Sequence, residues 1–248
     1  MSHTHLRELH TPPATGSKAL IELDDLCFAY EDAPALRHVS LSVREGDSVV
    51  LMGDNGSGKS TLLKIICGLL FAQKGSYRFD GDLVDERTMH DASFAKRLHQ
   101  RVGFIFQDSD AQLFCASVED EVAFGPRQMG LSEDEVARRV SDACRLLEIG
   151  HLRTRAPYAL SGGEKKRVAI ACVLSMNPDV YCFDEPFAGL DARARAWLLD
   201  FLGQLKSVRR TLVIATHDQS LADQVADYFV YMGEMHGYDD RPHVHINE

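Results

Sequence analysis

The sequence lacks any apolar run long enough to cross a bilayer. A membrane-spanning helix needs about 20 consecutive apolar residues, and no stretch of this chain approaches that length. Residues 1–18 contain charges, prolines and three histidines but no apolar core of the kind a secretory signal peptide requires. We therefore expect a protein that stays in the cytosol and does not itself span a membrane.

Paired cysteines and an excess of basic residues are also missing. The six cysteines have no C-x-x-C spacing, so neither a disulfide framework nor a cysteine metal site is predicted. Lysine and arginine number 27 against 37 aspartates and glutamates, a formal net charge of −10. Because contacts with nucleic-acid phosphates need a basic face, nucleic acid is not predicted as a partner. This charge does not exclude docking onto a membrane protein.

One glycine-rich segment carries the strongest signal. It reads Gly53-Asp54-Asn55-Gly56-Ser57-Gly58-Lys59-Ser60-Thr61 and fits the phosphate-binding pattern G-x-x-x-x-G-K-[ST]. An apolar run at 49–52 predicts a buried strand before it, and residues 59–70 predict a helix after it. The glycines let backbone N–H groups turn toward an anion that also faces the positive end of the helix dipole. Lys59 can reach the β- and γ-phosphates and Ser60 can bind Mg²⁺, which predicts a nucleotide site.

The order of predicted elements indicates an α/β fold around this P-loop. Strands are predicted at 19–30, 36–43, 75–79, 83–84, 102–106, 180–183, 211–215 and 228–232, and helices at 168–176, 192–206 and 221–226, with a helix or tight loop at 88–100. Strands alternating with helices favour a parallel sheet. Residues 131–149 have helical spacing, and Ser132 with Glu135 predicts a capping box at their start.

These patterns predict a P-loop NTPase core with a strand-rich nucleotide-binding subdomain and a mainly helical insert. The domain is expected to span residues 19–232, with the helical lobe at about 108–165. A flexible arm is predicted over 1–18 and a polar, histidine-containing tail over 233–248.

Two further segments fit the chemistry of a nucleotide site. The strand at 180–183 ends in Asp184-Glu185, so Asp184 can hold Mg²⁺ beside the P-loop and Glu185 can polarise an attacking water. Ser161-Gly162-Gly163-Glu164 predicts a capping box, but a cap does not require the glycine pair, whereas close approach to a phosphate does. Ser161 lies 23 residues (184 − 161) before Asp184.

With these motifs and a later His217, the chain resembles the ATP-binding-cassette (ABC) ATPases over about residues 19–232. The resemblance implies that Tyr30 stacks on adenine and that Gln107 contacts Mg²⁺. It implies that Asp191 crosses a dimer interface and that His217 touches the γ-phosphate. Without the resemblance, the same residues would be interpreted as packing, a strand cap, a helix N-cap and a structural histidine. Phe187 departs from the family, which commonly has Thr or Ser at this position, though its side chain is not a ligand there.

The runs 107–114 and 118–126, together with 163–171, are similar to the energy-coupling-factor importers, although the family usually has proline where Ser109 stands. This resemblance implies an ATPase subunit that powers uptake of a metal ion, with cobalt or nickel favoured, or of a vitamin. Two such subunits, identical or related, would bind ATP and Mg²⁺ head-to-tail beneath a transmembrane coupling subunit and a substrate-binding membrane subunit. The chain would then lie peripherally on the cytoplasmic face of the membrane.

Two alternatives stay open at this stage. One is a soluble ABC ATPase without a transporter, for example in cofactor assembly. The other is a nucleotide sensor that does not hydrolyse, against which Glu185 and His217 argue. Terminal histidines, at positions 3, 5, 10, 236, 243 and 245, could capture Co²⁺ or Ni²⁺ or could be solvated.

Overall fold

Two sheets of different strand order form the core of the computed structural model, which describes residues 18–31, 33–232 and 243–246. The larger sheet has the order β10-β9-β3-β8-β7-β6 and is parallel from β9 to β6, while β10 is antiparallel to β9. Its strands are β3 (Ser48–Met52), β6 (Val102–Ile105), β7 (Val180–Asp184), β8 (Thr211–Thr216), β9 (Tyr228–Tyr231) and β10 (His243–Ile246).

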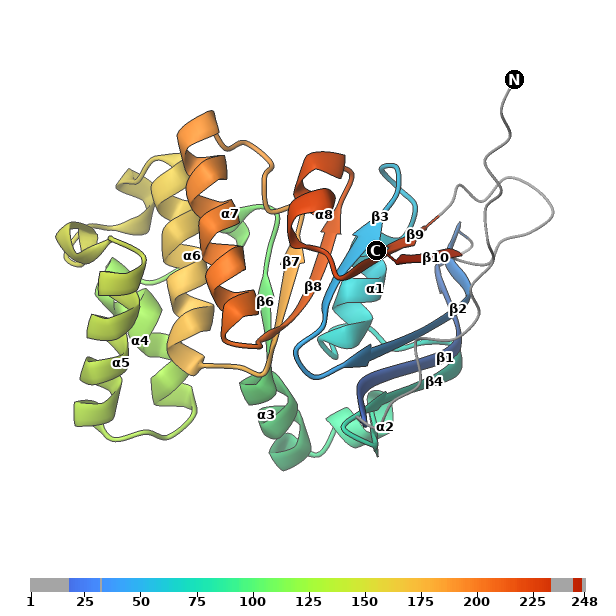
Figure 1. Ribbon diagram of the computed structural model, residues 1–248. Coiled ribbons are helices and arrows are strands. Elements are labelled where there is room, and N and C mark those ends of the chain that lie inside the picture. Colours follow the sequence, from blue (N-terminus) through green and yellow to red (C-terminus); the bar gives the residue numbers. More distant parts are fainter. Residues whose placement is uncertain (1–17, 32, 233–242, 247–248) are drawn as a thin grey trace, which may run out of the picture.

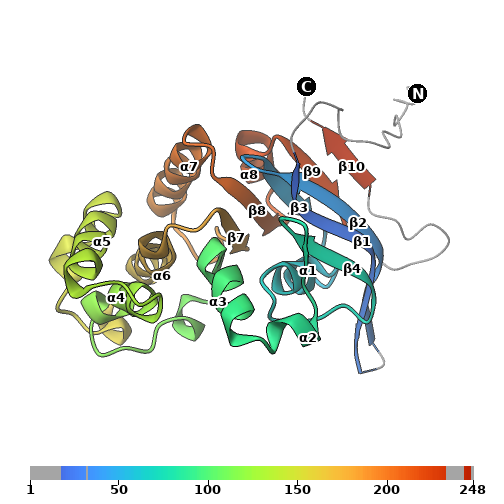
Figure 2. The same ribbon diagram turned by 90° about the horizontal axis from the view of Figure 1, so that it is seen from below.

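The smaller sheet is antiparallel and has the order β2-β1-β4-β5. Its strands are β1 (Ala19–Tyr30), β2 (Ala33–Arg44), β4 (Lys74–Phe79) and β5 (Asp82–Leu83). Helix α1 (Lys59–Ile66) lies between this sheet and the larger one (Figures 1 and 2). The predicted α/β fold, with a strand-rich part beside a parallel sheet, is therefore present.

Successive side chains along the central strands point to opposite faces of the sheet and belong to two separate hydrophobic cores. On β3, Val49 and Leu51 pack with α1 and the antiparallel sheet, whereas Val50 and Met52 face the other way and join the second core. Figure 1 shows the helices that cover this second face, with α4 and α5 lying beyond α6. These helices are α4 (Val118–Gln128), α5 (Glu133–Leu146), α6 (Gly162–Met176), α7 (Ala192–Ser207) and α8 (Gln219–Val225).

Several element boundaries differ from the predicted ones. Helix α1 ends at Ile66 rather than near residue 70, and α6 begins at Gly162 rather than at 168. The ambiguous segment 88–100 forms two short helices, α2 (Glu86–Met89) and α3 (Ala92–Arg101), which are separated where Asp91 caps α3.

Only one of the two hydrogen bonds of the capping box predicted at the start of α5 is present, so the prediction is wrong for the other. The Ser132 side chain does accept a hydrogen bond from the N–H of Glu135. The Glu135 carboxylate, however, binds Arg138 and Arg139 instead of returning to Ser132. These hydrogen bonds, that of Arg138 first, lower the pKa of Glu135 to about 2. Two cations within one helical turn therefore outcompete a single backbone N–H.

The ends of the chain lie largely outside the described residues. The predicted arm covers 1–18, of which only Lys18 is described, and most of the predicted tail falls on 233–242 and 247–248. Residues 243–246, which also belong to the predicted tail, form β10 and extend the large sheet past β9. Within the described part of the chain, no helix is long and apolar enough to cross a membrane, and all six cysteines are free thiols.

Candidate nucleotide-hydrolysis site

Parallel pairing brings the predicted site loops to one edge of the large sheet. The phosphate loop follows β3, Gln107 follows β6, Glu185 follows β7 and His217 follows β8. Because parallel strands end at the same edge, loops that are far apart in sequence meet there.

The phosphate loop requires glycine at two positions for identifiable reasons. Gly53 and Gly58 have φ of 149° and 94°, in the region that side chains disfavour. A Cβ on Gly53 would lie 2.4 Å from the carbonyl oxygen of Met232, and one on Gly58 would lie 2.4 Å from that of Ala35. Since Gly58 also begins α1 without a side-chain cap, the first N–H groups of the helix face the loop, as an anion site requires.

Lys59 lies at the centre of this loop. Its ammonium donates to the carbonyl oxygens of Gly53 at 2.6 Å and Asp54 at 2.9 Å. It is also 3.7 Å from the Glu185 carboxylate, and only 5% of the Lys59 side chain is exposed. The Lys59 ammonium is thus held between the carbonyls of the phosphate loop and Glu185, the carboxylate predicted to activate water.

Ser60 and Asp184 meet at a position that suits Mg²⁺. The Ser60 hydroxyl donates to Asp184 Oδ1 at 2.7 Å, across 124 residues of sequence. Burial raises the pKa of Asp184, and this hydrogen bond opposes the rise. A hydroxyl beside a carboxylate offers the hard oxygen ligands that Mg²⁺ prefers, so the two residues fit the predicted ion.

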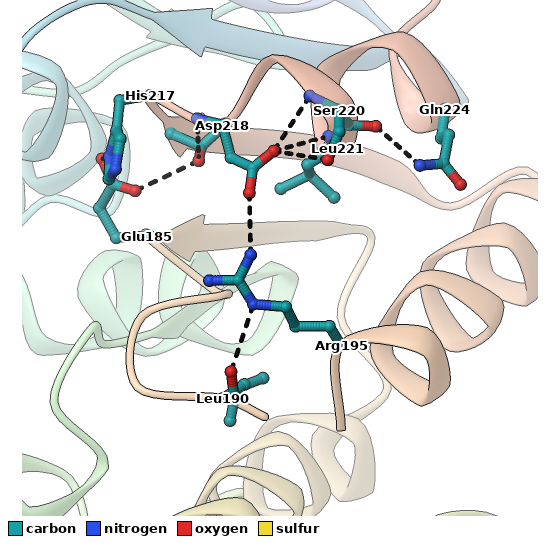
Figure 3. A network of polar contacts seen from close by, with 9 residues as sticks. Glu185, Leu190, Arg195, His217, Asp218, Ser220, Leu221 and Gln224 are labelled. Carbon is teal, nitrogen blue, oxygen red and sulfur yellow. Dashed lines mark hydrogen bonds and ion pairs between the residues drawn. The ribbon is translucent and has the colours of Figure 1, made fainter. Parts of the chain in front are cut away.

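Glu185 and His217, which follow β7 and β8, form a polar pair (Figure 3). Glu185 Oε1 lies 3.0 Å from His217 Nδ1, and Oε2 accepts a hydrogen bond of 3.2 Å from the Thr216 hydroxyl. Glu185 has φ of 42°, an uncommon value for a residue with a side chain. Its N–H donates to the carbonyl of Ala215, which holds this conformation. Such local strain is typical of functional positions.

Tyr30 stands beside the phosphate loop. Its ring is 45% exposed, and its hydroxyl lies 3.3 Å from the Thr61 hydroxyl in the first turn of α1. Phe28 supports the ring edge-to-face at a centroid distance of 4.9 Å. The partly exposed Tyr30 thus lies next to the loop, and its stacking on adenine stays a prediction.

The capping box predicted at the start of α6 is confirmed. The Ser161 side chain accepts from the N–H of Glu164, whose carboxylate accepts from the N–H of Ser161. Within the described residues, no neighbouring atom requires glycine at either position 162 or 163. A Cβ on Gly162 would lie in open space, and one on Gly163 would be 3.8 Å from the Ala194 side chain, an ordinary contact.

Gln107 and Asp191 are placed near the site but not joined to it within this chain. Gln107 is exposed, and in the described residues its side chain has no hydrogen-bond partner. The Asp191 carboxylate caps α7 by accepting from the N–H of Ala194 at 2.8 Å. Their roles toward Mg²⁺ and toward a dimer interface stay predictions.

Three residues of the site were not singled out from the sequence. Thr216 links Glu185 to the loop after β8, since its hydroxyl also accepts from the N–H of Asp218. Lys166 is almost fully buried and donates to the carbonyls of Phe106 and Gln107. Gln112 accepts from the N–H of Phe106 and donates to the carbonyl of Ala169. No motif marks such contacts, because Lys166 and Gln112 bind backbone groups, and Thr216 bonds a carboxylate 31 residues away in sequence.

Lys166→Met should destabilise the protein more than the same change at its neighbour. Burial lowers the pKa of Lys166 to about 8. Its loss leaves two carbonyls without a donor, which costs about 1–3 kcal/mol. In a chain of this size that is roughly 2–12 °C in Tm.

The matched control is Lys165→Met, which removes only a partly exposed ion pair with Asp110, worth less than about 1 kcal/mol. Thermal unfolding of both variants tests the difference. Equal Tm values for the two would show that the buried contacts of Lys166 do not stabilise the loop.

Together, the phosphate loop, the Ser60–Asp184 pair and the Glu185–His217 pair define a P-loop domain built to bind and hydrolyse a nucleotide.

A family model described as ABC transporter matches residues 36–188. The nickel import ATP-binding protein LarO of Lactiplantibacillus plantarum is 43% identical over 220 residues, covering 89% of this chain and 91% of that protein. The energy-coupling factor transporter ATP-binding protein EcfA2 of Methanospirillum hungatei is 42% identical over 214 residues, 86% of this chain and 53% of its own length.

Among solved structures, cbiO1 from Clostridium perfringens, part of the ABC transporter complex cbiONQ, superposes with a TM-score of 0.79 at 35% identity. That match covers 92% of this chain and 88% of cbiO1. The chain belongs to the ABC transporter family, as an ATP-binding subunit of the energy-coupling-factor type that hydrolyses ATP to drive transport.

Proposed function

We propose that this subunit powers uptake of nickel or cobalt through a membrane partner, with a vitamin as the alternative substrate class. The catalytic proposal rests on one observation. Lys59 and His217 both contact the buried Glu185 carboxylate, whose neighbour Asp184 binds Ser60. The metal proposal is supported by the relatives: one is a nickel import protein.

Each site residue has a distinct task in the proposed hydrolysis. Lys59 and the loop N–H groups bind the β- and γ-phosphates, while Tyr30 stacks on the base. Ser60, Asp184 and Gln107 would hold Mg²⁺, which when bound neutralises charge on the phosphate oxygens.

Glu185 takes the proton from water as the water oxygen attacks the γ-phosphorus and the bond to the ADP oxygen breaks. His217 fixes the Glu185 carboxylate through Nδ1 and presents its exposed ring to the γ-phosphate. Thr216 holds the second carboxylate oxygen, so the base has one orientation.

The proposal requires two copies, identical or related, arranged head-to-tail. No atom in the described part of the chain crowds the glycine pair at the start of α6. Glycines there would let a second chain bring its γ-phosphate against the N–H groups of α6. Asp191 would cross the same interface, and the pair would lie at the cytoplasmic face of the membrane, beneath the coupling and substrate-binding subunits.

Ser161→Arg tests the shared site. We expect ATP affinity of the separate chain to stay near wild type and ATP turnover to be lost, because the bulky cation blocks the partner's phosphate. A mixture of Ser161→Arg and Lys59→Ala chains contains one intact composite site and should recover part of the turnover.

Ser132→Arg is the control for this experiment. The Ser132 side chain accepts from the N–H three residues on, as that of Ser161 does, but without the returning carboxylate. Ser132→Arg therefore loses a helix cap worth about 1 kcal/mol away from the nucleotide. If no mixture exceeds the summed activity of the two variants, the two-chain site is wrong.

The substrate is tested by metal uptake in the source organism. Cells in which the chromosomal copy carries Lys59→Ala should accumulate less nickel or cobalt than wild-type cells, while uptake of other divalent metals is unchanged. Affinity purification of the intact subunit from detergent-extracted membranes should recover transmembrane partners. Recovery without any membrane protein would instead favour the soluble, cofactor-assembly alternative.

A further inference from the structure

The guanidinium of Arg195 joins the segment before α7 to the loop after β8, in addition to the contacts that Glu185 makes between them (Figure 3). Nε donates to the carbonyl of Leu190 at 3.2 Å, and Nη1 lies 3.2 Å from the Asp218 carboxylate. The same group stacks over the ring of Phe187 at 5.3 Å from its centroid. Arg195 therefore contacts both the segment before α7, which holds Asp191, and the residue that follows His217.

The contacts continue from Asp218 into the catalytic pair. Asp218 Oδ1 caps α8 by accepting from the N–H groups of Ser220 and Leu221. The N–H of Asp218 donates to the Thr216 hydroxyl at 3.1 Å, and that hydroxyl donates to Glu185 at 3.2 Å. An unbroken series of polar contacts thus runs from Leu190 through Arg195 to the carboxylate proposed as the base.

The geometry is more specific than a surface ion pair. An exposed pair alone contributes little, but here two different guanidinium nitrogens serve two different segments in one plane, which lysine cannot reproduce. Arg193, on the same helix turn, is exposed and has no polar side-chain contact within the described residues. The Phe187 ring, at the position where the family commonly has Thr or Ser, gives the guanidinium its third support.

We propose that Arg195 is a positioning residue that couples the 187–191 segment of one subunit to its own Glu185–His217 pair. The proposal rests on the two-chain function above, in which Asp191 reaches the partner. A partner contact that moves residues 189–191 would move the Leu190 carbonyl, Arg195 and Asp218 together. Closure of the dimer then sets the orientation of Glu185 and His217, and each site responds to the other.

The test compares Arg195→Ala, Arg195→Lys and Arg193→Ala in the full chain with ATP and Mg²⁺. For Arg195→Ala we expect kcat to fall about tenfold or more, in the range for loss of a hydrogen bond to a charged group. The Kd for ATP should change less than about twofold, and the dependence of rate on ATP should lose its positive cooperativity. Arg195→Lys should be intermediate, and Arg193→Ala should match wild type.

A double-mutant cycle locates the effect. Asp218→Asn keeps an N-cap oxygen for α8 but loses the charge, so it should add little to Arg195→Ala if the two act as a unit. If Arg195→Ala and Arg193→Ala turn over ATP at the same rate, the inference about Arg195 is wrong, while the proposed function stands. The inference is also wrong if the fall in turnover of Arg195→Ala is accompanied by an equal loss of ATP binding or by a lowered Tm. A wild-type chain without ATP turnover overturns the proposed function and this inference with it.

Discussion

Glu185→Gln should convert the protein into a stable ATP-bound dimer. The amide keeps the size of the carboxylate and can still bond Thr216 and His217, but it cannot take a proton from water. Loss of a positioned base slows hydrolysis by about 10²–10⁴-fold. The change also removes a negative charge near the γ-phosphate, so ATP binding should survive. Size-exclusion chromatography with ATP and Mg²⁺ should show dimer for the variant and mainly monomer for wild type.

The control carboxylate is Glu86, an exposed residue in the first turn of α2. Glu86→Gln should hydrolyse ATP at the wild-type rate and elute as wild type does. A Glu185→Gln protein that also turned over at the wild-type rate would remove Glu185 from the mechanism, and His217 would become the candidate base.

Lys59→Ala should abolish productive ATP binding. Lys59 is the cation held within the phosphate loop, and each charge-assisted hydrogen bond to a phosphate is worth about 1.5–3 kcal/mol. One such bond corresponds to roughly a 10–150-fold loss of affinity. Titration calorimetry with ATP and Mg²⁺ measures the loss, and steady-state turnover should fall with it.

Lys59 also donates to two loop carbonyls, so folding has to be measured separately. A thermal unfolding curve for Lys59→Ala shows whether the protein is still folded at the titration temperature. Lys74→Ala, an exposed change on β4, controls for the lost charge. Unchanged affinity together with unchanged turnover in folded Lys59→Ala protein would contradict the assignment of residues 53–61.

The parts of the site that sequence predicted are those with fixed local spacing. The phosphate loop and the Ser161–Glu164 box could be predicted because backbone geometry there depends on residues a few positions apart. The box at Ser132 has the same spacing, yet Glu135 binds two arginines of its own helix. Spacing alone cannot rank competing partners that are also local.

The polar contacts between residues far apart in the sequence could not be predicted, for a different reason. Lys166 serves carbonyls of residues 106 and 107, and Arg195 reaches Asp218 across α7 and α8. Any carbonyl can accept a hydrogen bond, so the sequence contains no feature that identifies which one does. The antiparallel pairing of β10 with β9 was also not predicted, because its four residues alternate polar and apolar over too short a length to distinguish a strand from a polar tail.

The pairing of β3 has a consequence for biosynthesis. Both neighbours of this strand, β8 and β9, come much later in the chain, and Ser48 pairs with Leu212, 164 residues later (212 − 48). At about 5–20 residues per second, a ribosome needs roughly 8–30 s to cover that distance. The strand that carries the phosphate loop therefore waits unpaired at the ribosome, while the β1–β2 hairpin can form at once. The nascent chain can complete its nucleotide site only after β8 has been synthesised.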